Sequence, residues 1–292
     1  MIYNLFGSAG FTVSVLGFGA GEIGDGSLSE DHVGSIVNQA ADAGITLFDT
    51  ARGYGESERR IGRHLSWRRK DLILSTKVGY GIHGLADWSY DIILAGIHEA
   101  MALMRTDYID IVHLHSCPIE VLQRGEVLHA LDQARQQGKI RVAAYSGENE
   151  ALRFAAESAV LGGLQSSVNV FDQRVIDEVI PGAVKNGKGY IAKRPLGNIP
   201  WKYTDQPVGA YAETYWLRMK AMGLDFGSQW TETALRFTAF HTGISSCIAG
   251  TTNPVNLMAN LAAIEKGPLP NEVVSQIRQA FKTHDQNWTG EV

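Results

Sequence analysis

Short apolar runs alternate with longer amphipathic segments along almost the whole chain. The apolar runs are typical of buried strands, and the predicted strands lie at residues 15–18, 45–48, 72–75, 109–114, 140–144, 164–168, 190–192 and 244–248. The amphipathic segments have apolar residues at helical spacing, and the predicted helices cover residues 29–43, 56–65, 91–104, 125–137, 149–160, 175–185, 231–240, 254–263 and 271–282. Each of the eight predicted strands is therefore followed by a predicted helix.

This alternation favours parallel strands joined by crossover helices. Eight such units fit a single α/β domain over residues 1–292, folded as a closed (β/α)8 TIM barrel. The alternative is an open doubly wound sheet, whose first unit normally has a glycine-rich phosphate turn. Glycines do follow the first predicted strand, but no helix begins directly after them, and Glu22 and Asp25 lie where a phosphate would approach. We therefore expect the barrel.

Two segments depart from the alternation. Residues 2–6 and 12–15 are β-like and flank a Gly-Ser-Ala-Gly turn, which predicts an N-terminal hairpin. After the seventh predicted strand, residues 195–227 form a long loop rich in Trp, Tyr and Pro. Long loops at this end of a barrel normally carry function. Six aromatic residues are placed in loops that could surround the mouth, although core or surface packing explains each one equally well, and they are Trp88, Trp201, Tyr203, Tyr211, Tyr215 and Trp216.

Composition argues against several classes of protein. The 26 Lys and Arg residues and 31 Asp and Glu residues give a net charge of −5, so no basic excess favours nucleic acid. Two basic clusters, at residues 59–63 and 68–70, are expected to form a solvated helix face and loop. No apolar run approaches the ~20 residues of a membrane span, and the first residues do not read as a secretory signal. With only Cys117 and Cys247, we expect a cytoplasmic protein.

Polar residues follow the second, third and fourth predicted strands, where barrel enzymes place catalytic groups. Asp49 ends the second strand and Tyr54 lies in the glycine-rich loop after it, whereas Lys77 follows the third strand and His115 the fourth. A buried Lys near a Tyr favours the phenolate and lowers its pKa, and an Asp keeps that Lys charged. Such a Tyr exchanges a proton with a carbonyl oxygen near neutral pH, while a neighbouring His hydrogen-bonds the same oxygen.

Several motifs surround these residues in a fixed order. They are Phe48-Asp49-Thr50-Ala51, Tyr54-Gly55-Glu56-Ser57-Glu58, Ser75-Thr76-Lys77-Val78, residues 107–115 ending on His115, and residues 138–146 ending on Ser146. Together the motifs resemble those of the aldo-keto reductases, and the resemblance runs from end to end. It implies hydride transfer between a nicotinamide cofactor, NADP or NAD, and a carbonyl or alcohol, without a metal. It also implies that Asp49, Tyr54, Lys77 and His115 form the catalytic tetrad and that the hairpin plugs the closed end of the barrel.

The same resemblance implies a set of cofactor-binding residues. Ser146 and Gln165 match two positions that hold the nicotinamide carboxamide. The remaining matches follow the seventh and eighth predicted strands, and they are Lys193, Arg194, Pro195, Leu196, Gly197, Gly250, Thr251, Thr252, Asn256 and Asn260.

Four positions depart from the family pattern, one of them Ala259, which replaces a frequent Glu. Gly147 replaces the usual Asn after the serine, so Glu148 or Asn149 would have to supply its hydrogen bond. Lys193 stands where an aromatic often stacks on the nicotinamide. Asn256 stands where NADP-binding members have an Arg for the 2′-phosphate. Because no cation replaces that Arg, we expect NAD(H) to be accepted at least comparably with NADP(H).

Three other functions remain open from the residues alone. His113 and His115 are two apart on one strand, which suggests a metal-dependent hydrolase, although more ligands are needed and His113 is better explained as a core histidine with its own hydrogen bonds. Lys77 suggests a Schiff-base aldolase, although Asp49 would keep the lysine charged. A non-catalytic nucleotide-sensing subunit is the third alternative. The expected partner is a small carbonyl or sugar substrate, with no nucleic acid and no membrane, and the oligomeric state is left open.

Overall fold

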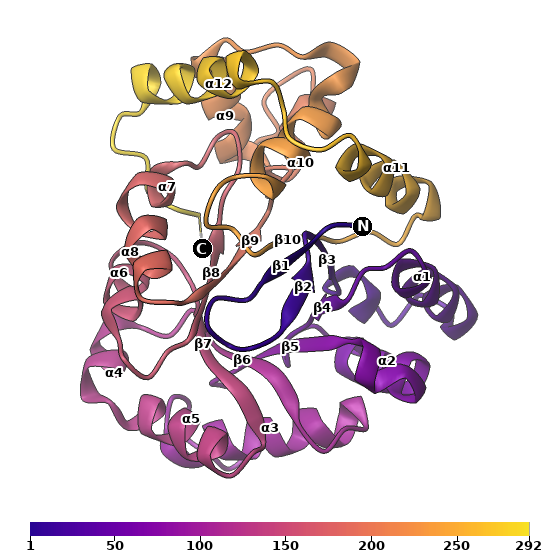
Figure 1. Ribbon diagram of the computed structural model, residues 1–292, viewed down its shortest axis with the longest axis vertical. Coiled ribbons are helices and arrows are strands. Elements are labelled where there is room, and N and C mark those ends of the chain that lie inside the picture. Colours follow the sequence, from indigo (N-terminus) through magenta and orange to yellow (C-terminus); the bar gives the residue numbers. More distant parts are fainter. Residues whose placement is uncertain (292) are drawn as a thin grey trace.

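The computed structural model describes residues 1–291 and contains a closed barrel of parallel strands. Its strands are β3 (Leu16–Gly19), β4 (Leu47–Asp49), β5 (Ile73–Val78), β6 (Ile109–His115), β7 (Ile140–Ser146), β8 (Gly163–Ser167), β9 (Gly189–Lys193) and β10 (Ser246–Ala249). Neighbours follow chain order from β3 to β9, and β10 closes the barrel between β9 and β3. Figure 1 shows the helices surrounding this barrel. The predicted (β/α)8 barrel is confirmed.

The helices mostly lie where the sequence pattern predicts them. They are α1 (Glu30–Asp42), α2 (Ser57–Leu65), α3 (Tyr90–Met104), α4 (Ile119–Arg124), α5 (Glu126–Gln136), α6 (Asn149–Glu157), α7 (Arg174–Glu178), α8 (Ile180–Lys185), α9 (Glu213–Met222), α10 (Trp230–Ala239), α11 (Pro254–Glu265) and α12 (Asn271–His284). The prediction of one helix over residues 175–185 is wrong. It breaks into α7 and α8 at Val179, whose backbone is non-helical, because Pro181 fits only the first turn of a new helix.

The N-terminal hairpin plugs one end of the barrel, as expected. Its strands β1 (Tyr3–Leu5) and β2 (Thr12–Ser14) pair antiparallel and cross the barrel end that faces the viewer in Figure 1. The rings of Phe6 and Phe11 stack with centroids 5.5 Å apart and pack against the first inward-facing residues of the barrel strands, such as Ile73 and Val142. The hydrophobic core inside the barrel is therefore concentrated at the plugged end.

The opposite end of the barrel is polar, because inward-facing positions alternate along each strand. On β4, the inward-facing position after Leu47 of the apolar layer is Asp49. On β5, the inward-facing positions after Ile73 are Ser75 and then Lys77. Side chains of the alternate set face the helices and form the larger apolar core. The fold thus leaves one open barrel end for chemistry.

The long segment after β9 contains a helix, which the sequence pattern did not reveal. Helix α9 places Tyr215 in the core, fully buried, so the prediction that Tyr215 and Trp216 lie in mouth loops is wrong. The Trp201 ring stacks on the Trp230 ring, with the centroids 5.1 Å apart, so its role is in packing. Of the six aromatic candidates, Tyr211 lines the groove described below.

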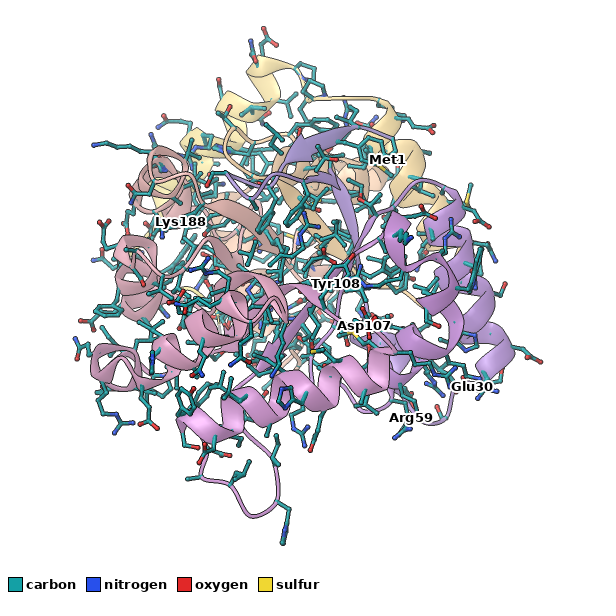
Figure 2. All side chains as sticks on the ribbon, turned by 60° about the horizontal axis from the view of Figure 1, so that its bottom comes forward. Met1, Glu30, Arg59, Asp107, Tyr108 and Lys188 are labelled. Atoms are coloured by element: carbon teal, nitrogen blue, oxygen red, sulfur yellow. The ribbon has the colours of Figure 1, made fainter. Side chains whose placement is uncertain are left out.

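The basic clusters are only partly solvated, which corrects a second prediction. Arg60 is 4% exposed and donates to the backbone oxygens of Ile23, Asp25 and Leu28, while Glu30 accepts from its Nε at 2.8 Å. Figure 2 shows Glu30 and Arg59 on the outer helices α1 and α2, where Arg59 is exposed as expected. Within residues 1–291, no helix is long and apolar enough to cross a membrane.

Candidate active site

Lys77 and Asp49 form a buried ion pair at the open end of the barrel. The Lys77 Nζ donates to Asp49 Oδ2 at 2.5 Å and to the Thr50 carbonyl at 2.7 Å, and both side chains are 2% exposed. Burial disfavours both charges, but the mutual attraction outweighs it, so the pKa of Asp49 is lowered and that of Lys77 is raised. Lys77 therefore stays charged, which argues against a Schiff-base nucleophile.

Tyr54 lies directly beside this pair. The Lys77 Nζ is 4.9 Å from the centroid of the Tyr54 ring, and the half-buried ring lines the groove at the barrel mouth. The loop that carries Tyr54 is fixed from below by a buried chain of hydroxyls, in which Thr50 donates to Ser57 and Ser57 donates to the Ala20 carbonyl, both at 2.7 Å. The strand ends thus bring a charged amine to a positioned phenol, as the sequence predicts.

Both histidines of β6 are neutral. Burial, followed by the charges of Lys77 and Lys193, lowers the pKa of His115 to about 3. Burial also lowers the pKa of fully buried His113 to about 4, with Asp49 opposing. The His113 Nε2 is 3.1 Å from Ser75 Oγ, whereas its Nδ1 has no hydrogen-bond partner within residues 1–291, so the expectation of a fully bonded core histidine is only half right.

The metal alternative finds no ligand set. Among the described residues, no three His, Cys, Asp or Glu side chains are grouped as a metal site requires. The ring of His115 instead packs against two tyrosines, with Tyr54 edge-on at 5.9 Å between centroids and Tyr80 stacked at 5.6 Å. Tyr80 also contacts His115 by a hydrogen bond, which the sequence pattern does not indicate.

Ser146 and Gln165 meet the tetrad at the centre of the barrel. The Ser146 hydroxyl donates to Gln165 Oε1 at 2.8 Å, and Gln165 Nε2 donates to Asp49 Oδ1 at 3.0 Å. Asp49 Oδ1 also accepts from Ser75 Oγ at 2.7 Å. Neighbouring side chains therefore fix the orientation of the Gln165 amide, which is fully buried.

A groove leads away from this centre across the barrel mouth. Its volume is about 310 Å³, and Asp49 and Tyr54 form one end. The other lining residues come from the loops after β3, β9 and β10, and they are Gly19, Ala20, Gly21, Glu22, Arg194, Pro195, Leu196, Asn198, Ile199, Tyr211, Ile248, Ala249 and Gly250. A larger cavity of about 550 Å³ lies at the plugged end beside the hairpin, far from the tetrad.

Only some of the expected cofactor residues line this groove. The ones that do are Arg194, Pro195, Leu196 and Gly250. Gly197 instead packs against the Phe171 ring, which an added Cβ would approach to 2.9 Å. Further out, Thr252 accepts at its carbonyl from His32 of α1, and Asn256 is exposed on the first turn of α11. Two further expected cofactor residues, Thr251 and Asn260, are buried and do not line the groove.

Lys193, at the position where the family often has an aromatic residue, forms an ion pair with Glu148. Its Nζ is 3.1 Å from Glu148 Oε1, and the same oxygen accepts from the Ser167 backbone NH at 2.8 Å. Burial raises the pKa of Glu148 and lowers that of Lys193, while the pairing opposes both shifts. An added Cβ at Gly147 would lie 2.3 Å from the Tyr145 hydroxyl oxygen, so Tyr145 occupies that space. Glu148 is committed to Lys193, and Asn149 bonds to Gly290 and is not available to replace the missing Asn.

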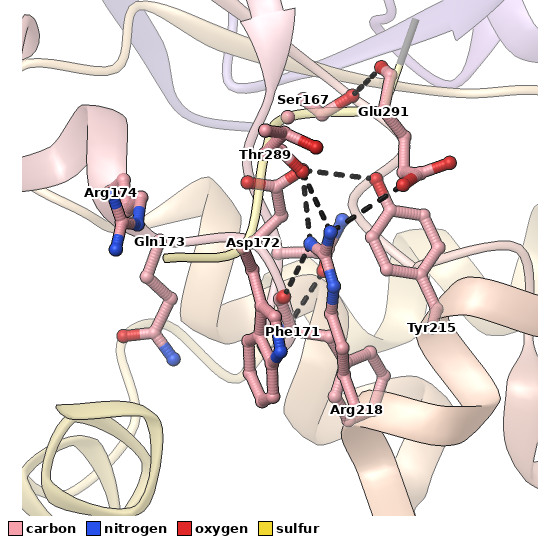
Figure 3. A network of polar contacts seen from close by, with 12 residues as sticks. Ser167, Phe171, Asp172, Gln173, Arg174, Tyr215, Arg218, Thr289 and Glu291 are labelled. Atoms are coloured by element: carbon pink, nitrogen blue, oxygen red, sulfur yellow. Dashed lines mark hydrogen bonds and ion pairs between the residues drawn. The ribbon is translucent and has the colours of Figure 1, made fainter. Parts of the chain in front are cut away.

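The C-terminal tail is held by a network of polar contacts to α9 and to residues 167–172, which Figure 3 shows. Arg218 of α9 donates to the Thr289 carbonyl at 2.7 Å and lies 3.4 Å from Glu291 Oε1 and 3.8 Å from Asp172 Oδ2. Arg194 donates to the Glu291 carbonyl and to Ser167 Oγ. The tail therefore accepts a hydrogen bond from the Arg194 guanidinium, which the family resemblance assigns to cofactor binding.

Known proteins with the same architecture identify the class. The Aldo/keto reductase family model matches residues 15–282, and the chain belongs to this family. L-galactose dehydrogenase from Arabidopsis thaliana is 26% identical over 93% of this chain and 91% of that protein. A probable voltage-gated potassium channel subunit beta from Oryza sativa subsp. japonica is 27% identical over 97% of each. The holo form of the aldo-keto reductase AKR11C1 from Bacillus halodurans superposes with a TM-score of 0.83 at 26% identity, covering 96% of each chain.

Family membership implies NAD(P)-dependent oxidoreductase chemistry on small carbonyl compounds. The residues present fit such a cofactor. The Ser146–Gln165 pair offers a fixed donor and acceptor beside the tetrad, and the groove extends from Tyr54 along the glycine-rich edges of β3 and β10. At Gly250, an added Cβ would lie 2.8 Å from the Gly19 carbonyl, so the two strands meet without side chains and keep this floor open.

Proposed function

We propose that the protein is an NAD(P)-dependent reductase of aldehydes, ketones or sugars, or the corresponding alcohol dehydrogenase. The observation that carries this proposal is the buried Lys77–Asp49 pair under the Tyr54 ring. A charged amine in this position attracts the negative charge that develops on the Tyr54 oxygen during proton transfer, so Tyr54 is suited to give or take a proton at the substrate oxygen. Neutral His115, next to Tyr54, then donates a hydrogen bond to the same oxygen.

The chain's own residues divide the work of the reaction between them. In reduction, Tyr54 delivers the proton to the carbonyl oxygen, Lys77 stabilises the resulting phenolate, and Asp49 keeps Lys77 charged. Ser146 and Gln165 would hold the nicotinamide carboxamide, and Arg194, Pro195, Leu196 and Gly250 would hold the rest of the dinucleotide along the groove. When bound, the nicotinamide supplies or accepts the hydride.

Turnover measured on parallel panels of sugars and aldehydes, each with NAD(H) and NADP(H), tests this function. Sugars belong in the panel because the relative from Arabidopsis thaliana is named L-galactose dehydrogenase. We expect cofactor-dependent turnover with at least one class. Nucleotide binding without turnover of any substrate would favour the alternative of a nucleotide-sensing subunit, which the potassium channel subunit beta relatives keep open.

A further inference from the structure

A short loop after β5 brings a tyrosine to His115. Tyr80 follows Lys77 by three positions, between Gly79 and Gly81. Its hydroxyl is 2.7 Å from His115 Nδ1, and its ring stacks on the imidazole with 25° between the planes. Two separate contacts, one polar and one face-to-face, therefore hold the same histidine.

The loop itself is held rigidly from its far side. The Trp88 backbone NH donates to the Gly79 carbonyl at 2.8 Å, and the indole lies so close to Gly79 that an added Cβ would be 2.0 Å from it. Gly81 is fixed at both polar groups, because its NH donates to Asp87 Oδ1 at 3.0 Å and its carbonyl accepts from Arg52 at 2.8 Å. Tyr80 therefore has little freedom to leave His115.

The direction of the Tyr80–His115 hydrogen bond follows from the partners available. Burial and then the nearby Tyr54 raise the pKa of Tyr80, so its hydroxyl carries a proton to donate. Within residues 1–291, His115 Nδ1 is the one acceptor within reach of that hydroxyl, and His115 Nε2 has no hydrogen bond to the chain. A neutral imidazole that accepts at Nδ1 carries its proton at Nε2.

We propose that Tyr80 is a positioning residue that donates to His115 Nδ1, fixes the Nε2–H tautomer and so presents a hydrogen-bond donor to the carbonyl oxygen of the substrate. This inference rests on the proposed function, in which His115 binds that oxygen. Without the Tyr80 hydroxyl, the imidazole can populate the other tautomer or flip. In the other tautomer an acceptor nitrogen faces the carbonyl oxygen, and after a flip a ring C–H faces it, so in both arrangements the N–H hydrogen bond is lost.

The test is Tyr80→Phe, which keeps the stacked ring and removes the hydroxyl. Long-range ¹H–¹⁵N NMR on the intact protein reports the tautomer, and loss of the signal in His115→Gln assigns it. We expect the Nε2–H pattern in the wild type and a tautomer mixture in Tyr80→Phe. We also expect kcat/KM for the carbonyl substrate to fall about three- to tenfold, the effect of one neutral hydrogen bond, with cofactor affinity unchanged.

Tyr90→Phe is the matched control. Tyr90 also packs against a histidine, His129, at 5.5 Å between centroids, but on the outer helices, so its substitution should change neither readout. An Nδ1–H pattern in the wild type, or Tyr80→Phe with an unchanged tautomer and unchanged kcat/KM, would overturn the proposal. The NMR measurement needs neither cofactor nor substrate. A wild type without turnover on the panels would therefore count against the proposed function, while the tautomer result would still decide the Tyr80 contact.

Discussion

Lys77 and Asp49 come from adjacent strands, and each offsets the cost of burying the other's charge. A buried pair of this kind is a weak source of stability, because desolvation takes back most of the Coulomb gain. Its value here is electrostatic: the pair holds a permanent positive charge 4.9 Å from the centre of the Tyr54 ring. At the scale of single residues, then, a structurally costly pair is best explained by the proton chemistry it supports.

Tyr54→Phe tests that explanation directly. The substitution keeps the ring against Lys77 and His115 but removes the proton, so we expect kcat to fall by on the order of 10²–10⁴. Steady-state kinetics on any active substrate measures it, with cofactor binding by fluorescence as the control for an intact groove. A kcat close to that of the wild type would show that another group protonates the carbonyl.

Asn256→Arg tests the cofactor prediction at a position outside the groove lining. Asn256 is exposed on the first turn of α11 and is neutral, so it provides no charge for a 2′-phosphate. An Arg there would add a charge-assisted contact worth about 1.5–3 kcal/mol, or roughly ten- to a hundredfold in affinity for NADP(H). The measurement is kcat/KM for both cofactors on one substrate.

For the wild type, we expect NAD(H) to be used at least as well as NADP(H). If the wild type instead strongly prefers NADP(H) and the new arginine changes nothing, other residues bind the phosphate. His32, which bonds the Thr252 carbonyl at 2.7 Å, is then the next residue to substitute.

At the scale of elements, α9 and the C-terminal tail stabilise each other through Arg218. Its side chain is 5% exposed, and it bonds carbonyls of Phe171 and Thr289 while its guanidinium lies over the Trp288 ring at 5.2 Å. This one residue joins three segments that lie far apart in the sequence. The tail in turn contacts Arg194, so the packing of α9 also affects the side of the groove.

Arg218→Met should therefore destabilise the fold. The new side chain fills the space but leaves the Phe171 and Thr289 carbonyls without their donor and Asp172 without its ion-pair partner, so we expect a loss of about 1–3 kcal/mol in the free energy of unfolding. Urea denaturation measures the change. Lys220→Met is the control on the same helix, because Lys220 is exposed and its ammonium only lies over Trp216. Equal stability of the two variants would mean that the tail network contributes little.

At the scale of the whole molecule, burial of His113 and His115 makes stability depend on pH. In the folded protein their pKa values are about 4 and about 3, whereas an unfolded histidine titrates near 6.5. Between these values the unfolded chain binds more protons. The free energy of unfolding therefore falls as pH drops below 6.5. Each histidine should contribute on the order of 1–2 kcal/mol of this loss between pH 7 and pH 5.

Urea denaturation at pH 7 and pH 5, for the wild type and His113→Gln, isolates one of these contributions. The comparison is needed because Asp172, whose pKa burial raises to about 7, acts in the opposite direction. We expect the wild type to lose more stability on acidification than His113→Gln does. The same loss in both proteins would show that His113 does not bind a proton on unfolding in this range.

The sequence pattern alone is enough to predict the barrel, the hairpin and the polar residues at the strand ends, whereas the plug role of the hairpin and the tetrad were implied by the family resemblance. Strand and helix periods are local properties, and the carboxyl ends of parallel strands meet at one end of a barrel whatever the details of packing. The strand pattern therefore suffices to place Asp49, Lys77 and His115 together. The roles assigned to them, the single domain and the cytoplasmic location remain predictions.

Only the tertiary structure decided which polar partners these side chains have. The Tyr80–His115 bond, the pairing of Lys193 with Glu148, the burial of Arg60 and the tail contacts of Arg194 all join residues from different elements. No local period encodes such contacts, because they depend on how loops of irregular length fold over the barrel mouth. The reason is physical: a strand end fixes where a side chain starts, but its hydrogen bonds depend on what the rest of the chain brings within about 3 Å of it.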